Sequence, residues 1–234
     1  MRTLRQYRMT ESGIGMEIWH LWESPALPFN RREILRYAGE PGAQGDASLP
    51  LEEILRAAAS VRCRAVWRLY PIVREAGGIL NLGFLRTESR AVNRFLRSCE
   101  ETVLFALTAG VEMDRIIARE SLRSPLRGLL AHAAGAERTE TACDALTRDV
   151  LAALPGREAV GRFSPGYGDL PLAVQQNVLE ALPAGRLLGI TLNDAQIMSP
   201  SKSVTALIGL KYREGSDTDD PAGAAEGPGT DPVL

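Results

Sequence analysis

The sequence is poor in the residues that most often bind metals or carry redox chemistry. Among its 234 residues are two histidines, His20 and His132, and three cysteines, Cys63, Cys99 and Cys143. So few histidines argue against a histidine-rich metal site. The cysteines form no Cys-x-x-Cys pair, and their odd number argues against a disulfide framework. Cys143 lies on an apolar helix face, where a buried thiol is expected. We therefore expect no bound metal, and electrons for any reduction must come from another molecule.

Net charge and long apolar runs are lacking too. The net charge of −2 gives no basic surface for nucleic acid. Arginine and lysine together number 27, of which only Lys202 and Lys211 are lysines, and the arginines are scattered or lie near acids. No apolar run is long enough to span a bilayer, and the start has no signal-peptide core. We expect a cytoplasmic protein that binds neither nucleic acid nor a membrane.

The chain does have enough apolar sequence for one substantial core, at 45% hydrophobic residues. Its two ends differ from the middle. Residues 1–15 show no clear periodicity and are predicted to be poorly ordered, with Met16 a plausible true start. Residues 214–234 are rich in Ser, Asp, Gly, Ala and Pro, and they cannot bury enough surface to offset the entropy of ordering. We predict a single domain over residues 16–213 and a disordered tail after it.

The interior mixes helical and strand patterns without the regular alternation of a parallel sheet. Ser89 is suited to cap a helix. Helical spacing is found over residues 31–37, 51–62, 89–97, 112–121, 126–154 and 171–182. Strand patterns occupy residues 65–72, 79–83, 102–109, 188–192 and 204–210. This pattern is compatible with an α+β fold.

The most informative segment is residues 162–169, Arg-Phe-Ser-Pro-Gly-Tyr-Gly-Asp, which lies between two helical patterns. The planar fork of Arg162 suits a carboxylate. Pro165 fixes φ, while Gly166 and Gly168 let the backbone approach a ligand closely. Tyr167 is expected to project from this loop. Pro-Gly and Gly-Asp pairs also mark ordinary turns, and most such turns bind nothing, so the segment alone favours a structural role.

A second segment, residues 198–203, is a polar loop between two strand patterns. Its sequence is Met-Ser-Pro-Ser-Lys-Ser, rich in hydroxyl groups and backbone donors. Composition alone favours a solvated connection between strands.

Together the two segments resemble the activation domain of cobalamin-dependent methionine synthase, in the form that occurs as a separate small protein. The similarity lies in Arg162-x-x-x-Gly166-Tyr167, continuing to Gln175, and in residues 198–204 about thirty residues later. It extends more weakly through residues 32–39, 103–110 and 133–146, and so covers roughly residues 30–212. The resemblance implies an α+β fold: a single domain with a twisted antiparallel sheet and flanking helices.

Activation domains of this family bind S-adenosylmethionine and present its methyl group to the cobalamin of methionine synthase. An electron from flavodoxin or a ferredoxin-type donor reduces cob(II)alamin, and methyl transfer traps the reduced cobalt. The resemblance therefore implies an accessory protein of methionine biosynthesis, acting in reductive methylation. Its partner is expected to be a methionine synthase that lacks its own activation domain. Whether the chain is an enzyme by itself is left open.

The resemblance also implies roles for individual residues. Arg162 pairs with the methionyl carboxylate, and Tyr167 lies near the cobalamin as the candidate catalytic residue. Glu140, on the long helix, favours the sulfonium cation, or is simply an exposed helix carboxylate. Backbone contacts to the ligand are expected from Ser164, Pro165 and Gly166. A loop near the ligand or the corrin is matched by Met198, Ser199, Pro200, Ser201, Lys202 and Ser203.

Two departures from the family leave alternatives open. The larger, fused domain carries another acid shortly before the arginine, where residues 156–158 here lack clean register. The fused domain also continues past its last strand. The same site could serve another corrinoid methyltransferase, or the chain could be a non-catalytic subunit that caps the cobalamin module.

Overall fold

The computed structural model describes residues 1–10, 13–39 and 48–213. Its centre is a six-stranded sheet in which every neighbouring pair of strands is antiparallel. From one edge to the other the strands are β1 (Arg2–Thr10), β2 (Gly13–Glu23), β3 (Arg64–Pro71), β7 (Glu101–Thr108), β11 (Ser203–Tyr212) and β8 (Arg157–Phe163). The predicted α+β fold with an antiparallel sheet and flanking helices is confirmed.

Both faces of the central strands are buried, so the sheet separates two apolar clusters. On β7, Phe105 and Leu107 face one cluster, while the alternate residues Leu104 and Ala106 face the other. This alternation follows from the two-residue period of a strand. Because both faces are covered, β7 is apolar at nearly every position, which is why its sequence gives so clear a strand signal.

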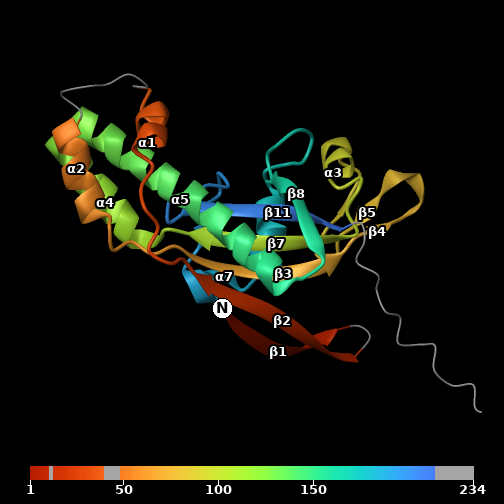
Figure 1. Cartoon of the computed structure of the whole chain (residues 1–234). Helices are drawn as coiled ribbons and strands as arrows, with labels where there is room; N and C mark the ends of the chain where they lie inside the picture. Colours follow the sequence, from red (N-terminus) through yellow and green to blue (C-terminus); the bar gives the residue numbers. More distant parts are fainter. Residues whose placement is uncertain (11–12, 40–47, 214–234) are drawn as a thin grey trace, which may run out of the picture.

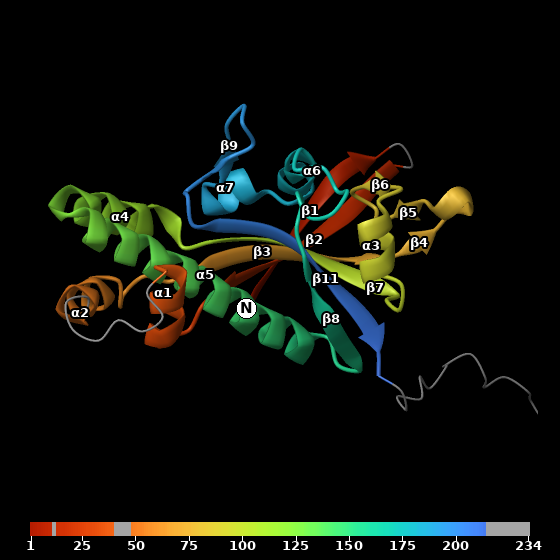
Figure 2. The same ribbon diagram turned by 90° about the horizontal axis from the view of Figure 1, so that it is seen from above.

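The first cluster lies under four helices, of which α5 is the longest. Figures 1 and 2 show α5 crossing the sheet, with α1, α2 and α4 gathered at one end. Ser124 caps α5 by accepting a hydrogen bond from the Arg127 amide (3.2 Å), and Pro125 fills its first position. The helices are α1 (Arg31–Tyr37), α2 (Ser48–Ala57), α4 (Gly110–Arg123) and α5 (Pro125–Ala153).

The second cluster, on the opposite face, lies under shorter elements. Ser89 caps α3 by accepting from the Val92 amide (3.2 Å), as its position in the sequence predicts. The helices on this face are α3 (Arg90–Phe95), α6 (Val174–Ala181) and α7 (Ala184–Leu188). Two small sheets complete the fold. The first consists of β4 (Val73–Arg74), β5 (Leu80–Asn81) and β6 (Arg86–Thr87), with the short helix η1 (Ala76–Gly78) between β4 and β5. The second consists of β9 (Thr191–Leu192) and β10 (Met198–Ser199).

β1 pairs along its whole length with β2, and β2 crosses residue 16, where the sequence analysis places the start of the domain. Two sequence predictions need correction. Residues 188–192 are not one strand: Leu188 ends α7, Gly189 follows in the left-handed conformation, and only β9 is extended. Arg162 lies not in a loop between helices but in β8. The predicted tail, residues 214–234, lies outside the described residues.

None of the helices within the described residues is long and apolar enough to cross a membrane.

Candidate functional site

A pocket of about 540 Å³ lies where α5 passes the β8 edge of the sheet. One wall is α5, the other is β8 with the loop after it, and β11 contributes apolar side chains between them. The lining includes Glu140, Cys143 and Thr147 of α5, residues 161–164 and Tyr167 of the other wall, and Val204 and Ala206 of β11. Glu140, Cys143 and Thr147 share a face of α5 because they lie three, four and seven residues apart.

Arg162 is held between two carboxylates of α5. Its Nη1 lies 2.6 Å from Oδ1 of Asp144, and its Nη2 lies 3.0 Å from Oε2 of Glu140. We refer to Glu140, Arg162 and Asp144 as the ion triad. Burial opposes the charged form of Arg162, but the hydrogen bond to Asp144 and the neighbouring negative charges raise its pKa overall. Arg162 therefore keeps its positive charge between the two carboxylates.

The loop that follows Arg162 is fixed to α3 by Asp169. The Asp169 carboxylate accepts hydrogen bonds from the Ser89 hydroxyl, the Arg90 amide (2.8 Å) and the Ala91 amide (3.1 Å). Gly168 stands against the same helix, with φ +59°, and a Cβ there would lie 2.5 Å from Cβ of Ala91. The loop thus approaches α3 more closely than any residue with a side chain would permit.

Replacing Asp169 with asparagine should lower the midpoint of thermal unfolding at pH 7 by about 2–4 °C. The Ser89 hydroxyl and the two amides hold the pKa of Asp169 at about 2, below its ordinary value of 3.8. Because the folded pKa is depressed, this stabilisation is complete above about pH 4 and is lost as the pH falls through about 2. Calorimetric scans from pH 7 to pH 2 should show the two proteins converging in acid. A constant difference across that range would contradict the assignment.

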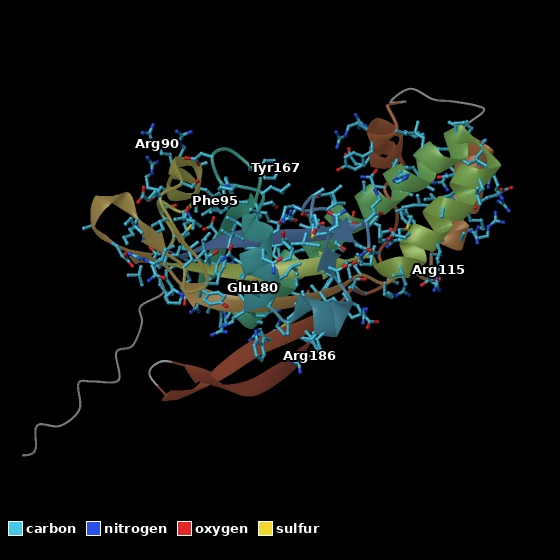
Figure 3. The ribbon with its side chains drawn as sticks, turned by 180° about the vertical axis from the view of Figure 1, so that it is seen from behind. Arg90, Phe95, Arg115, Tyr167, Glu180 and Arg186 are labelled. Atoms are coloured by element: carbon cyan, nitrogen blue, oxygen red, sulfur yellow. The ribbon has the colours of Figure 1, made fainter. Side chains whose placement is uncertain are left out.

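Aromatic side chains continue the wall beyond the loop. Tyr167 meets Phe163 edge-on, with ring centroids 6.2 Å apart, and Phe163 lies 5.3 Å from Phe95 of α3. Tyr167 is 65% exposed, and Figure 3 shows it beside α3, near the labelled Arg90 and Phe95. The tyrosine is therefore held at the rim of the pocket, open to a second molecule.

The loop of residues 198–203 does not line this pocket. Ser201 donates its hydroxyl to Asp114 of α4 (2.6 Å) and its amide to the same carboxylate (2.9 Å). Ser203, which is buried, donates to the hydroxyl of Thr108 (2.8 Å) or to the carbonyl of Pro200 (2.7 Å). Met198 packs with the second cluster, and Ser199 pairs with β9. These contacts fix the entry to β11, and a ligand role for the loop stays a prediction.

Lys202, the residue before β11, packs against α5. Its aliphatic stem lies over Gly135, where a Cβ would come within 2.9–3.2 Å of the lysine carbons. Burial lowers the pKa of Lys202, although Asp114 opposes that effect. Gly135 thus leaves room on α5 for the stem of Lys202, which a larger residue would have to displace.

The structure brings together Arg162, Glu140, Ser164 and Tyr167, all of which the sequence analysis selected. The sequence analysis missed Asp144, although it follows Glu140 by four residues and so lies on the same helix face. It also missed Asp169 as the anchor of the loop. Burial raises the pKa of the Cys143 thiol, so this cysteine contributes a neutral apolar surface and not a nucleophile. The described residues contain no cluster of three or more His, Cys, Asp or Glu side chains that could hold a metal.

The fold and pocket were compared with known proteins. No family model matches the chain, and no curated protein matches it significantly. Among solved structures, a crystal structure of the MetH reactivation domain bound to AdoHcy matches with a TM-score of 0.54 and 14% sequence identity. The match covers 82% of this chain and 78% of that one. At this identity the likeness establishes a shared fold.

Proposed function

We propose that this protein binds S-adenosylmethionine in the pocket between α5, β8 and β11. In this proposal it supports reductive methylation of cob(II)alamin on a separate cobalamin-dependent methionine synthase. The observation that carries the proposal is the ion triad at the pocket wall. It stands in a chain that shares its fold with a MetH reactivation domain bound to AdoHcy.

The pocket suits this ligand in size and charge. A volume of about 540 Å³ lies in the range of small-molecule sites. S-adenosylmethionine carries a carboxylate, an ammonium group and a sulfonium group. Arg162 offers charge-assisted hydrogen bonds to the carboxylate, while the carboxylate of Glu140 favours the positive sulfonium. Val204, Ala206 and Cys143 supply apolar surface in the same pocket.

The proposed methyl transfer depends on the position of the methyl group relative to the cobalt more than on acid–base catalysis. The sulfonium carbon–sulfur bond breaks as the methyl group passes to the reduced cobalt of the partner, and S-adenosylhomocysteine remains. The contribution of this chain is to hold the methyl group in line with the incoming nucleophile, which lowers the entropic part of the barrier. In this proposal Tyr167, which is 65% exposed, contacts the partner's cobalamin.

Reactivation of a methionine synthase without its own activation domain tests this function. The synthase is prepared in its inactive cob(II)alamin form and mixed with this protein, S-adenosylmethionine and flavodoxin or a ferredoxin-type donor. We expect the spectrum of methylated cobalamin, and the return of synthase activity, only when all components are present. Reactivation that proceeds equally without this protein would sink the proposal, as would an absence of S-adenosylmethionine binding both with and without the synthase.

A further inference from the structure

The ion triad holds one more carboxylate than the proposed ligand contacts use. Glu140 and Asp144 are one helical turn apart on α5, and both reach the terminal nitrogens of one guanidinium. A carboxylate ligand that approaches Arg162 end-on, through Nη1 and Nη2, competes with both of them for the donors of these nitrogens. Which one leaves, and what it then does, follows from their surroundings.

Asp144 is the more exposed of the two carboxylates, although its contact with Arg162, at 2.6 Å, is shorter than the 3.0 Å contact of Glu140. Its side chain is 68% exposed, against 52% for Glu140 and 26% for Arg162. Ion pairs in such exposed positions contribute little to stability, because water solvates the separated charges well. Glu140 lines the pocket itself, whereas Asp144 is not among the lining residues and reaches the pocket through its contact with Arg162. Exchange of Asp144 for a ligand carboxylate on Nη1 replaces one charge-assisted hydrogen bond with another of the same kind, so its net cost is small.

The released Asp144 stays near its first position, because its backbone belongs to α5. In an α-amino acid the ammonium group is bonded to the carbon that also carries the carboxylate. A ligand whose carboxylate occupies Nη1 of Arg162 therefore brings its ammonium group close to Asp144. An unpaired carboxylate beside an ammonium group forms a charge-assisted hydrogen bond.

The charges agree with this exchange. The triad carries a net charge of −1, and an amino-acid head adds one negative and one positive group to it. After the exchange, each charge of the ion triad and of the ligand's amino-acid head has a neighbour of opposite charge. Buried charges need such partners when a ligand excludes water. A ligand with a carboxylate but no ammonium group would leave Asp144 unpaired and bring the head region to −2.

We propose that Asp144 is a specificity-determining residue of this pocket. It receives the α-ammonium group of the ligand after yielding Arg162 to the ligand carboxylate. The inference rests on the proposed function and names how that site recognises an α-amino-acid head.

Calorimetric titration with two chemically stable probes tests it. The probes are S-adenosylhomocysteine and its deaminated analogue, in which hydrogen replaces the α-ammonium group. The unchanged protein should bind S-adenosylhomocysteine about tenfold or more tightly than the analogue. In D144N this preference should fall to about threefold or less, because the amide accepts from ammonium without a full charge.

The control variant is E158Q, which also removes one exposed acid. Glu158 lies on β8 outside the pocket lining and faces Lys211 at 3.5 Å, so its loss should leave the preference unchanged. If D144N binds both probes but keeps the full preference, the inference is wrong while the proposed function stands. If neither probe nor S-adenosylmethionine binds the unchanged protein, with or without the synthase, both are overturned.

Discussion

Replacing Arg162 with alanine is expected to weaken S-adenosylmethionine binding by about tenfold to a hundredfold. The loss corresponds to about 1.5–3 kcal/mol for a hydrogen bond to a charged group. The variant also leaves Glu140 and Asp144 as like charges one helical turn apart, which repels the ligand carboxylate further. Calorimetric titration with S-adenosylmethionine measures the effect directly.

Arg162→Lys separates charge from geometry in this prediction. A lysine restores one positive charge, but its single ammonium group cannot present the parallel donors of a guanidinium fork. We expect it to recover part of the lost affinity. Unchanged affinity in Arg162→Ala, with the fold intact by circular dichroism, would show that the ligand carboxylate binds elsewhere.

The largest expected effect on stability comes from Trp67, on β3 in the centre of the sheet. Its side chain is 1% exposed and stacks on His20 of β2, with ring centroids 4.1 Å apart. Replacement by alanine should lower the free energy of unfolding by about 3–5 kcal/mol, because a large cavity opens under α5. Chemical denaturation, followed by circular dichroism, measures the change.

Trp67→Phe is the matched control. The indole Nε1 is buried with no hydrogen-bond partner among the described residues, so phenylalanine removes an unpaired donor as well as some volume. The cost should stay below about 1.5 kcal/mol. Equal destabilisation by alanine and phenylalanine would mean that the indole nitrogen, and not the ring volume, matters at this position.

The elements with strong local signals could be predicted from the sequence. The α1 helix agrees with its predicted range, α5 agrees to within one residue at each end, and Ser89 caps α3 as expected. Their apolar periodicity and caps are local properties. By contrast, β1 gains its structure from backbone pairing with β2, and such pairing leaves no periodic trace in the sequence.

The β8 strand was missed because it is an edge strand. Its sequence, Arg-Glu-Ala-Val-Gly-Arg-Phe, is half exposed and contains three charges, as edge strands often do.

A strand prediction for residues 157–163 would have indicated that Arg162 lies beside Glu140 and Asp144. From the turn between α5 and β8, Arg162 lies about 17 Å along the strand, at ~3.3 Å per residue. Asp144 and Glu140 lie about 14 and 20 Å back along the helix, at ~1.5 Å per residue. Arg162 therefore falls between them.

The loop of residues 198–203 shows that composition alone cannot distinguish a ligand-binding loop from a structural one. Ser201 and Ser203 use their hydroxyls on Asp114, Thr108 and a backbone carbonyl, all of which come from tertiary structure. Serines that bind a ligand and serines that fix a chain reversal have the same sequence signature. Only their neighbours distinguish the two.

The exposed position of Tyr167 has a thermodynamic consequence. In the proposed function, a ligand held against the ion triad, beside a tyrosine that is 65% exposed, forms part of the surface that the synthase meets. Ligand and partner then cannot bind independently. By linkage, the factor by which the ligand changes the affinity for the synthase equals the factor by which the synthase changes the affinity for the ligand. If direct contact between them makes this coupling favourable, the proposed function predicts that the synthase raises the affinity of this chain for S-adenosylmethionine.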